Sequence, residues 1–115
     1  MIFQYKTKTK GNIIVFKLIG ELIEREQPKV MLEDIVETLE SGNKNILLDL
    51  QDLKYINSSG FTILINIITK VNAAGGKLSV CHANERITEL FHITKLSRKF
   101  NEYKTEEESI AFLNK

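Results

Sequence analysis

The chain has 115 residues, 43% hydrophobic and 27% charged, which is typical of a folded globular protein and argues against disorder. Sixteen basic and fifteen acidic residues leave a net charge of +1, which gives no support to a nucleic-acid partner. One cysteine excludes an internal disulfide, and no membrane-spanning run or signal pattern is visible, so we expect one cytoplasmic domain over residues 1–115.

The first two predicted elements are strands. Residues 2–9 alternate between apolar and polar side chains, and residues 13–19, after Gly11-Asn12, are rich in β-branched and aromatic residues. The two segments are therefore expected to pair as a hairpin. The lysines of this region are typical of the wet face of an edge strand that resists aggregation: Lys6, Lys8, Lys10 and Lys17.

A helix and a central strand are predicted next. Apolar residues recur at helical spacing over residues 28–40, Pro28 fits the first turn, and Ser41-Gly42-Asn43 ends the helix. Residues 45–50 are almost wholly apolar, as in a strand covered on both faces. This strand is expected in the middle of the sheet.

The centre of the chain predicts a parallel crossover unit. A loop over residues 51–58 leads to a helix over 59–74, which Gly75-Gly76 stops, and a strand over 77–81 follows with Cys81 as a buried thiol. Strand, helix and strand in this order imply a right-handed parallel connection.

The last third completes an alternating pattern. One short helix is expected around Ile87, Leu90 and Phe91, a strand near residues 100–103, and a last helix with Ile110 and Leu113 on its apolar side. The fold class predicted is α/β, with a mixed sheet of four to five strands and about four helices.

Metal and nucleotide sites are not indicated by the spacing of residues. His82 and His92 stand ten positions apart without a ligand motif, and no glycine-rich phosphate loop is present. Asp49 and Asp52 could bind Mg²⁺ or perform acid–base chemistry, but we favour Asp49 bonding to loop backbone and Asp52 beginning a turn. No metal, cofactor or catalytic residue is therefore assigned.

Ser59 stands where the second helix is expected to begin. As the N-cap, its hydroxyl would satisfy a free backbone N–H one turn along. A serine nucleophile needs an oriented general base, and the sequence offers no convincing partner, so the chain is not expected to be an enzyme.

The second predicted helix carries apolar residues beyond its core-facing stripe. That stripe consists of Leu64, Ile67, Ile68 and Val71. Phe61 and Ile65 fall at the edge of the apolar arc, next to Ser59. Two readings stay open: these side chains form a docking surface, or they pack under a neighbouring loop.

Residues 49–61 (DLQDLKYINSSGF), with Gly75-Gly76-Lys77-Leu78 and Gly20-Glu21-Leu22, resemble the signature of STAS domains, specifically bacterial anti-sigma factor antagonists. The resemblance covers essentially the whole chain. It implies a partner switch, in which the unphosphorylated antagonist binds an anti-sigma factor that is also a serine kinase and so releases a sigma factor. A PP2C-type phosphatase would reverse phosphorylation.

The resemblance also implies site residues. The phosphoacceptor is Ser59, with Ser58 as the secondary candidate. The residues expected to bind the partner are Glu21, Ile23, Asn57, Ser58, Phe61, Thr62 and Ile65.

The chain departs from the family pattern at two positions. The family often has aspartate where this chain has Asn57 and Ile23. The alternative function within the same fold is a scaffold or accessory subunit, stressosome-like or lipid-transport-like, without a phosphorylation switch. A monomer or weak dimer is expected for the antagonist, and assembly size in solution would distinguish it from the alternative.

Overall fold

The computed structural model describes residues 3–23 and 26–115. Five strands form one mixed sheet in the order β1-β2-β3-β4-β5, with β1 antiparallel to β2 and the other neighbours parallel. The strands are β1 (Gln4–Lys10), β2 (Ile13–Leu22), β3 (Asn45–Ile56), β4 (Lys77–Cys81) and β5 (Glu102–Tyr103). The helices are α1 (Glu26–Glu40), α2 (Ser58–Ala73), α3 (Glu85–Ile93), α4 (Ser97–Phe100) and α5 (Glu106–Leu113). The predicted fold class is confirmed.

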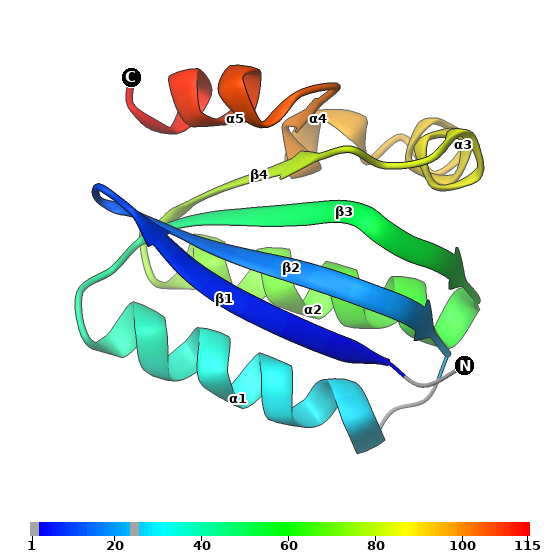
Figure 1. Cartoon of the computed structure of the whole chain (residues 1–115), viewed down its shortest axis with the longest axis horizontal. Helices are drawn as coiled ribbons and strands as arrows, with labels where there is room; N and C mark the ends of the chain where they lie inside the picture. Colours follow the sequence, from blue (N-terminus) through cyan, green and yellow to red (C-terminus); the bar gives the residue numbers. More distant parts are fainter. Residues whose placement is uncertain (1–2, 24–25) are drawn as a thin grey trace.

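The sheet has a helical layer on each side (Figure 1). Helices α1 and α2 cover one face, called here the α1/α2 face, and α5 lies over part of the other, the α5 face. The main hydrophobic core lies on the α1/α2 face. A smaller cluster lies beneath α5, and its buried members are Ile13, Val15, Leu47, Cys81 and Leu113.

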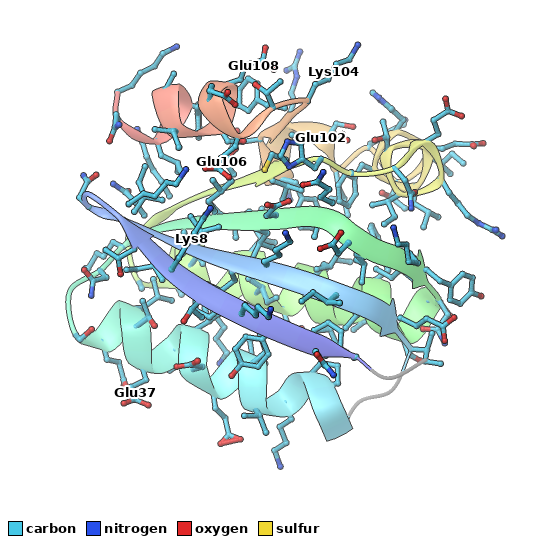
Figure 2. All side chains as sticks on the ribbon, in the orientation of Figure 1. Lys8, Glu37, Glu102, Lys104, Glu106 and Glu108 are labelled. Carbon is cyan, nitrogen blue, oxygen red and sulfur yellow. The ribbon has the colours of Figure 1, made fainter. Side chains whose placement is uncertain are left out.

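The predicted hairpin is confirmed, and the edge-strand prediction is correct for the lysines of β1 but wrong for Lys17, which lies on β2 between β1 and β3. Strands β1 and β2 pair around Gly11, whose φ of +60° is a left-handed conformation that glycine adopts easily. Lys6, Lys8 and Lys10 are exposed on β1. Figure 2 shows Lys8 reaching towards Glu106 of α5 on the α5 face, and their charged groups lie 3.7 Å apart. Ile2, the first residue of the predicted strand, lies outside the described residues.

Strands β2 and β3 are longer than predicted. They pair as far as Leu22 and Ile56, with register shifts between Lys17 and Ile19 and between Gly20 and Glu21. These irregularities interrupt the two-residue alternation that identifies a strand in sequence. The predicted loop over residues 51–58 is therefore wrong for residues 51–56.

The two aspartates of β3 have different roles. Asp49 accepts a hydrogen bond from the backbone N–H of Gln51 at 3.0 Å, so its predicted bond to backbone is confirmed. Asp52 does not begin a turn, because it lies within β3 and its carboxylate is 3.2 Å from the Lys17 ammonium.

The predicted core stripe of α2 is confirmed, since Leu64, Ile67, Ile68 and Val71 are all buried. The helix ends at Ala73, and Gly75 follows with a φ of +74°. Among the described residues, no helix combines the length and the apolar character needed to cross a membrane.

Candidate functional site

Helix α2 begins one residue earlier than predicted, and its N-cap is Asn57. Asn57 has extended backbone (φ −106°, ψ −175°), and its side-chain oxygen accepts a hydrogen bond from the N–H of Gly60 at 2.8 Å. The prediction that Ser59 caps this helix is wrong: Ser59 is the second residue of α2. Asparagine and serine cap equally well, and β3 continues to Ile56, so Asn57 is the first residue free to do so.

Asn57 also connects the helix to the end of β2. Its side-chain amide donates to the carbonyl oxygen of Ile23 at 3.4 Å, and its backbone N–H donates to that of Leu22 at 3.5 Å. An aspartate in this place could cap the helix but could not donate to Ile23. Glu21 lies opposite Tyr55 in the register of β2 and β3. The structure thus brings Glu21, Ile23 and Asn57 to one end of the sheet.

Gly60 lets α2 approach the sheet closely. The residue is buried, and a β-carbon placed on it would overlap the carbonyl oxygen of Leu22. The same atom would lie 2.8 Å from the carbonyl carbon of Leu22 and 2.9 Å from Cγ1 of Ile56. The glycine of the Ser-Ser-Gly sequence is therefore a packing requirement that positions both serines.

The two serines line different grooves. Ser58 is exposed and lines an opening of about 640 Å³ between α2 and α3, called here the α2–α3 groove. Ser59 is half-buried and lines a smaller opening of about 340 Å³, the α1–α2 groove. The α2–α3 groove is bounded by Ile56, Asn57, Ser58, Phe61, Arg86, Glu89, Leu90, Ile93 and Thr94. The α1–α2 groove is bounded by Pro28, Lys29, Leu32, Ser59, Thr62, Ile63 and Asn66.

Phe61 packs against neighbouring helices and also lines a groove, so its role as a docking residue stays a prediction. Its ring centroid lies 5.9 Å from that of Phe91 and 6.3 Å from that of Phe100, so it packs beneath α3 and α4. It is only half-buried, and it also lines the α2–α3 groove. Ile65, in contrast, is partly buried against the main core.

Thr62 follows Phe61 on α2, about 100° around the helix axis, and lines a different groove. It is exposed, and its hydroxyl donates to the carbonyl oxygen of Ser58 at 3.1 Å. Its side chain lines the α1–α2 groove beside Ser59. Ser58, Phe61, Thr62 and Ile65 have i, i+3, i+4, i+7 spacing and therefore lie along one face of α2, which borders both grooves.

Helix α3 supplies groove residues that were not predicted. Ile93 is 67% exposed, an unusual exposure for a large apolar side chain, and Leu90 is partly buried beside it. The guanidinium carbon of Arg86 lies 5.7 Å from the centre of the Tyr55 ring. Arg86, Leu90 and Ile93 have i, i+4, i+7 spacing, which marks one face of a helix and could have identified them.

The chemistry of this region is that of a binding surface. The histidines are engaged elsewhere: His82 Nδ1 lies 3.0 Å from the Asp49 carboxylate, and His92 Nδ1 lies 3.2 Å from the Ser97 hydroxyl. The helix start offers two hydroxyls, a first turn without acidic residues, and apolar side chains from α2 and α3. Such a surface can dock a protein and can present a hydroxyl for modification.

Comparison with known proteins agrees with this reading. A relative from Thermotoga neapolitana is 34% identical over 74 residues, which cover 64% of this chain and 66% of that protein. The anti-sigma-B factor antagonist of Bacillus subtilis is 30% identical over 89 residues, covering 77% of this chain and 80% of the relative.

Solved structures share the fold. A candidate anti-sigma factor antagonist of Thermotoga maritima superposes with a TM-score of 0.86 at 21% identity, covering 96% of this chain and 95% of that one. The antagonist SpoIIAA superposes in its unphosphorylated form with a TM-score of 0.73 at 19% identity, covering 98% of both chains. Its phosphorylated form superposes with a TM-score of 0.72 at 20% identity, covering 96% of this chain and 98% of that one.

The expectation of a non-enzymatic regulator agrees with these names, because an antagonist is named for the protein it opposes and not for a reaction. The STAS domain family matches residues 4–109, which is nearly the whole chain. The chain therefore belongs to the STAS domain family, and its relatives are anti-sigma factor antagonists.

Proposed function

We propose that this chain is an anti-sigma factor antagonist that docks its partner through the α2–α3 groove and is switched off by phosphorylation of Ser59. The observation that carries the proposal is the Ser-Ser-Gly sequence in the first turn of α2, where Ser58 lines that groove and Ser59 lines the adjoining α1–α2 groove. The partner is an anti-sigma factor with serine kinase activity, and docking releases a sigma factor. A PP2C-type phosphatase reverses the modification, and the cycle takes place in the cytoplasm.

The groove favours a protein partner with an apolar side chain beside an acidic one. Ile93, Leu90 and Phe61 offer apolar surface, and burying the exposed two thirds of Ile93 would contribute roughly 1–2 kcal/mol, in proportion to the value for a fully buried aliphatic side chain. Arg86 and Glu89 add one cation and one anion at the groove, and arginine forms paired hydrogen bonds with carboxylates, so an acidic group of the partner fits beside Arg86. Apolar anchors with a charged neighbour are typical of the energetic centre of an interface.

A phosphate on Ser59 is expected to be compatible with the folded domain but not with the docked complex. It adds a charge of about −1.5 to −2 next to free N–H groups at the start of α2, where the helix dipole favours an anion. Lys29 lines the same groove as Ser59 and supplies a cation. A docked partner, however, must desolvate or pair the phosphate. Phosphorylation is therefore expected to abolish binding and to leave the domain folded.

The departures at Asn57 and Ile23 bear on kinase recognition. Asn57 removes one negative charge next to the acceptor and uses its amide to hold the end of β2. A kinase that reads an aspartate before the serines would phosphorylate this chain slowly. Efficient phosphorylation therefore requires a kinase whose contacts match Asn57.

The acceptor is tested by incubating the protein with ATP and the candidate anti-sigma kinases, followed by intact-mass and peptide mass spectrometry. We expect one phosphate, absent from Ser59→Ala and retained by Ser58→Ala, its matched neighbour. A phosphate lost only in Ser58→Ala would move the acceptor to Ser58. Binding without any phosphorylation would contradict the switch and favour the scaffold alternative.

The docking surface is tested by measuring the affinity for the unphosphorylated partner. Ile93→Ser should weaken binding about tenfold, or about 1.4 kcal/mol, because it removes an apolar anchor. Val30→Ser is the matched control, since Val30 is 60% exposed on α1 and should not contact the partner. Ser59→Asp should also weaken binding. Equal losses for Ile93→Ser and Val30→Ser would contradict the assignment of the groove.

A further inference from the structure

We propose that Asp49, Cys81 and His82 form a binding site for a divalent transition metal of the Zn²⁺ type, on the α5 face of the sheet. One ligand atom from each of these residues lies within 4.8 Å of the other two. The site is separate from the grooves around α2, so the inference does not depend on the proposed function.

Pairing within the sheet and one unusual backbone conformation bring the three side chains together. Asp49 of β3 and Cys81 of β4 are register partners, so their side chains lie next to each other on one face. His82 follows Cys81 directly and would point to the opposite face if the strand continued. Its φ of +60° is a left-handed conformation, which is uncommon for a residue other than glycine. The chain turns there, and Nδ1 of His82 lies 3.0 Å from Asp49 Oδ1.

The distances agree with tetrahedral metal coordination. Zn–S bonds of about 2.3 Å and Zn–N bonds of about 2.0–2.1 Å place the sulfur and nitrogen of a tetrahedral site about 3.6 Å apart. Cys81 Sγ and His82 Nδ1 are 3.6 Å apart. The nitrogen and oxygen of such a site are about 3.4 Å apart, so the hydrogen bond between Asp49 and His82 must open by about 0.4 Å. The third pair, the Asp49 oxygen and Cys81 Sγ, lies within 4.8 Å and would be about 3.6 Å apart around a bound ion.

The donor set and the burial favour a borderline metal over Mg²⁺ or Ca²⁺. One sulfur, one nitrogen and one oxygen suit Zn²⁺ or Co²⁺, whereas the harder ions prefer oxygen ligands alone. Asp49 and Cys81 are buried, and the His82 side chain is 29% exposed, so the ion reaches the site past His82. Three protein ligands leave a fourth position for water or another ligand.

Metal binding must displace the proton of the thiol. Burial, together with the negative charges of Asp49 and Glu106, raises the pKa of Cys81 to about 12, so the metal-free residue is a neutral thiol at pH 7. Each bound ion therefore releases one proton from Cys81, and the proton that Nδ1 of His82 donates towards Asp49 must move to Nε2 before Nδ1 can bind the ion. The same carboxylates attract the divalent cation, and Lys8 opposes it.

A metal at this site would hold the segment that leads into α3. His82 stands two residues before Asn84, which caps α3 through a hydrogen bond to the N–H of Ile87. Helix α3 forms one wall of the α2–α3 groove. The ion would tie this wall to the centre of the sheet through β3 and β4.

Cobalt titration tests the site directly. The chelator-treated protein is titrated with Co²⁺ and followed by absorption, because a cobalt–thiolate bond gives a charge-transfer band in the near ultraviolet. We expect one equivalent to bind with this band, and Zn²⁺ to displace the cobalt. His82→Asn should weaken binding at least tenfold, since asparagine tolerates the left-handed backbone but lacks the imidazole. His92→Asn, the matched control on exposed α3 surface, should bind like the wild type.

Other results would overturn the proposal. One is the absence of a charge-transfer band in the cobalt-treated wild-type protein. The other is that His82→Asn binds Co²⁺ as tightly as the wild type. Cys81→Ser should lose the band, with circular dichroism showing whether this variant is folded. X-ray absorption of the cobalt-loaded wild type needs no variant: a sulfur neighbour at about 2.3 Å supports the site, and a shell of oxygen and nitrogen alone contradicts it.

Discussion

Replacement of Gly60 by alanine separates two physical effects of opposite sign. Gly60 is the third residue of α2, and alanine is the better helix former by about 1 kcal/mol, so helix propensity predicts a more stable protein. The structure predicts the reverse. The new β-carbon would overlap the carbonyl oxygen of Leu22, and it would lie 2.9 Å from Cγ1 of Ile56.

The steric term should be the larger one. Carbon atoms in contact normally lie about 3.5–4.0 Å apart, so the start of α2 must move away from β2 by roughly 1 Å. The closest atom belongs to backbone and cannot rotate aside. Overpacking of this type costs typically 1–3 kcal/mol, and the displaced helix also strains the cap at Asn57. We expect Gly60→Ala to lower the free energy of unfolding by about 2 kcal/mol after the gain in propensity.

Urea unfolding followed by circular dichroism measures this difference. For a domain of this size, about 2 kcal/mol lowers the urea midpoint by roughly 1–2 M. Ser58→Ala is the control, because Ser58 lies in the same turn but is exposed, and its midpoint should stay close to that of the wild type. An unchanged or higher midpoint for Gly60→Ala would refute the argument that this glycine sets the distance between α2 and β2.

Three further predictions concern the cap, an ion pair and the cysteine. Asn57→Ala should cost about 1 kcal/mol in urea unfolding, and Asn57→Asp clearly less, because only aspartate retains the capping oxygen. The Lys10 ammonium lowers the pKa of Glu106 below its ordinary 4.5. The stabilisation from this ion pair is present above about pH 4.5 and is lost as the pH falls through the lowered pKa. In Glu106→Gln, the free energy of unfolding should therefore fall less steeply with decreasing pH below about 4.5 than in the wild type. Equal acid slopes for both proteins would contradict the pairing. Cys81 in the native, metal-free protein should resist iodoacetamide and react once urea unfolds the chain, because it is buried; rapid native labelling would contradict this.

The fold could be predicted from the sequence where hydrophobic periodicity is regular. Residues 28–40 and 59–74 carry helical stripes, and glycine or proline marks their ends, so both helices follow from local physics. The end of β3 could not be predicted in this way. Gln51 and Asp52 are two polar residues in succession, so the alternation of apolar and polar side chains is interrupted where the register against β2 shifts. Only the pairing with β2 identifies this segment as part of a strand.

The candidate site could be predicted in part for a similar reason. Ser58 and Ser59 are visible as two adjacent hydroxyls before an apolar helix, but the groove that each one lines depends on its angle around α2 and on where α1 and α3 pack. A strand that ends at Leu50 predicts a cap at Ser59, whereas β3 continues to Ile56 and the cap is Asn57. One error in a strand boundary thus became an error in the role of a site residue.

Under the proposed function, the architecture separates the phosphorylated serine from the surface that selects the partner. The serines are positioned by the capping bond of Asn57 and by the contact between Gly60 and Leu22, which involve β2, β3 and α2 only. Arg86 and Ile93 belong to α3, which is anchored from behind by the stacked rings of Phe91 and Phe100, whose centroids lie 4.6 Å apart. Exposed residues of α3 can therefore change without disturbing either the anchor or the helix start. Ile93→Ser is therefore expected to weaken docking in the α2–α3 groove, measured as affinity, without changing the exposure of Ser59 in the α1–α2 groove.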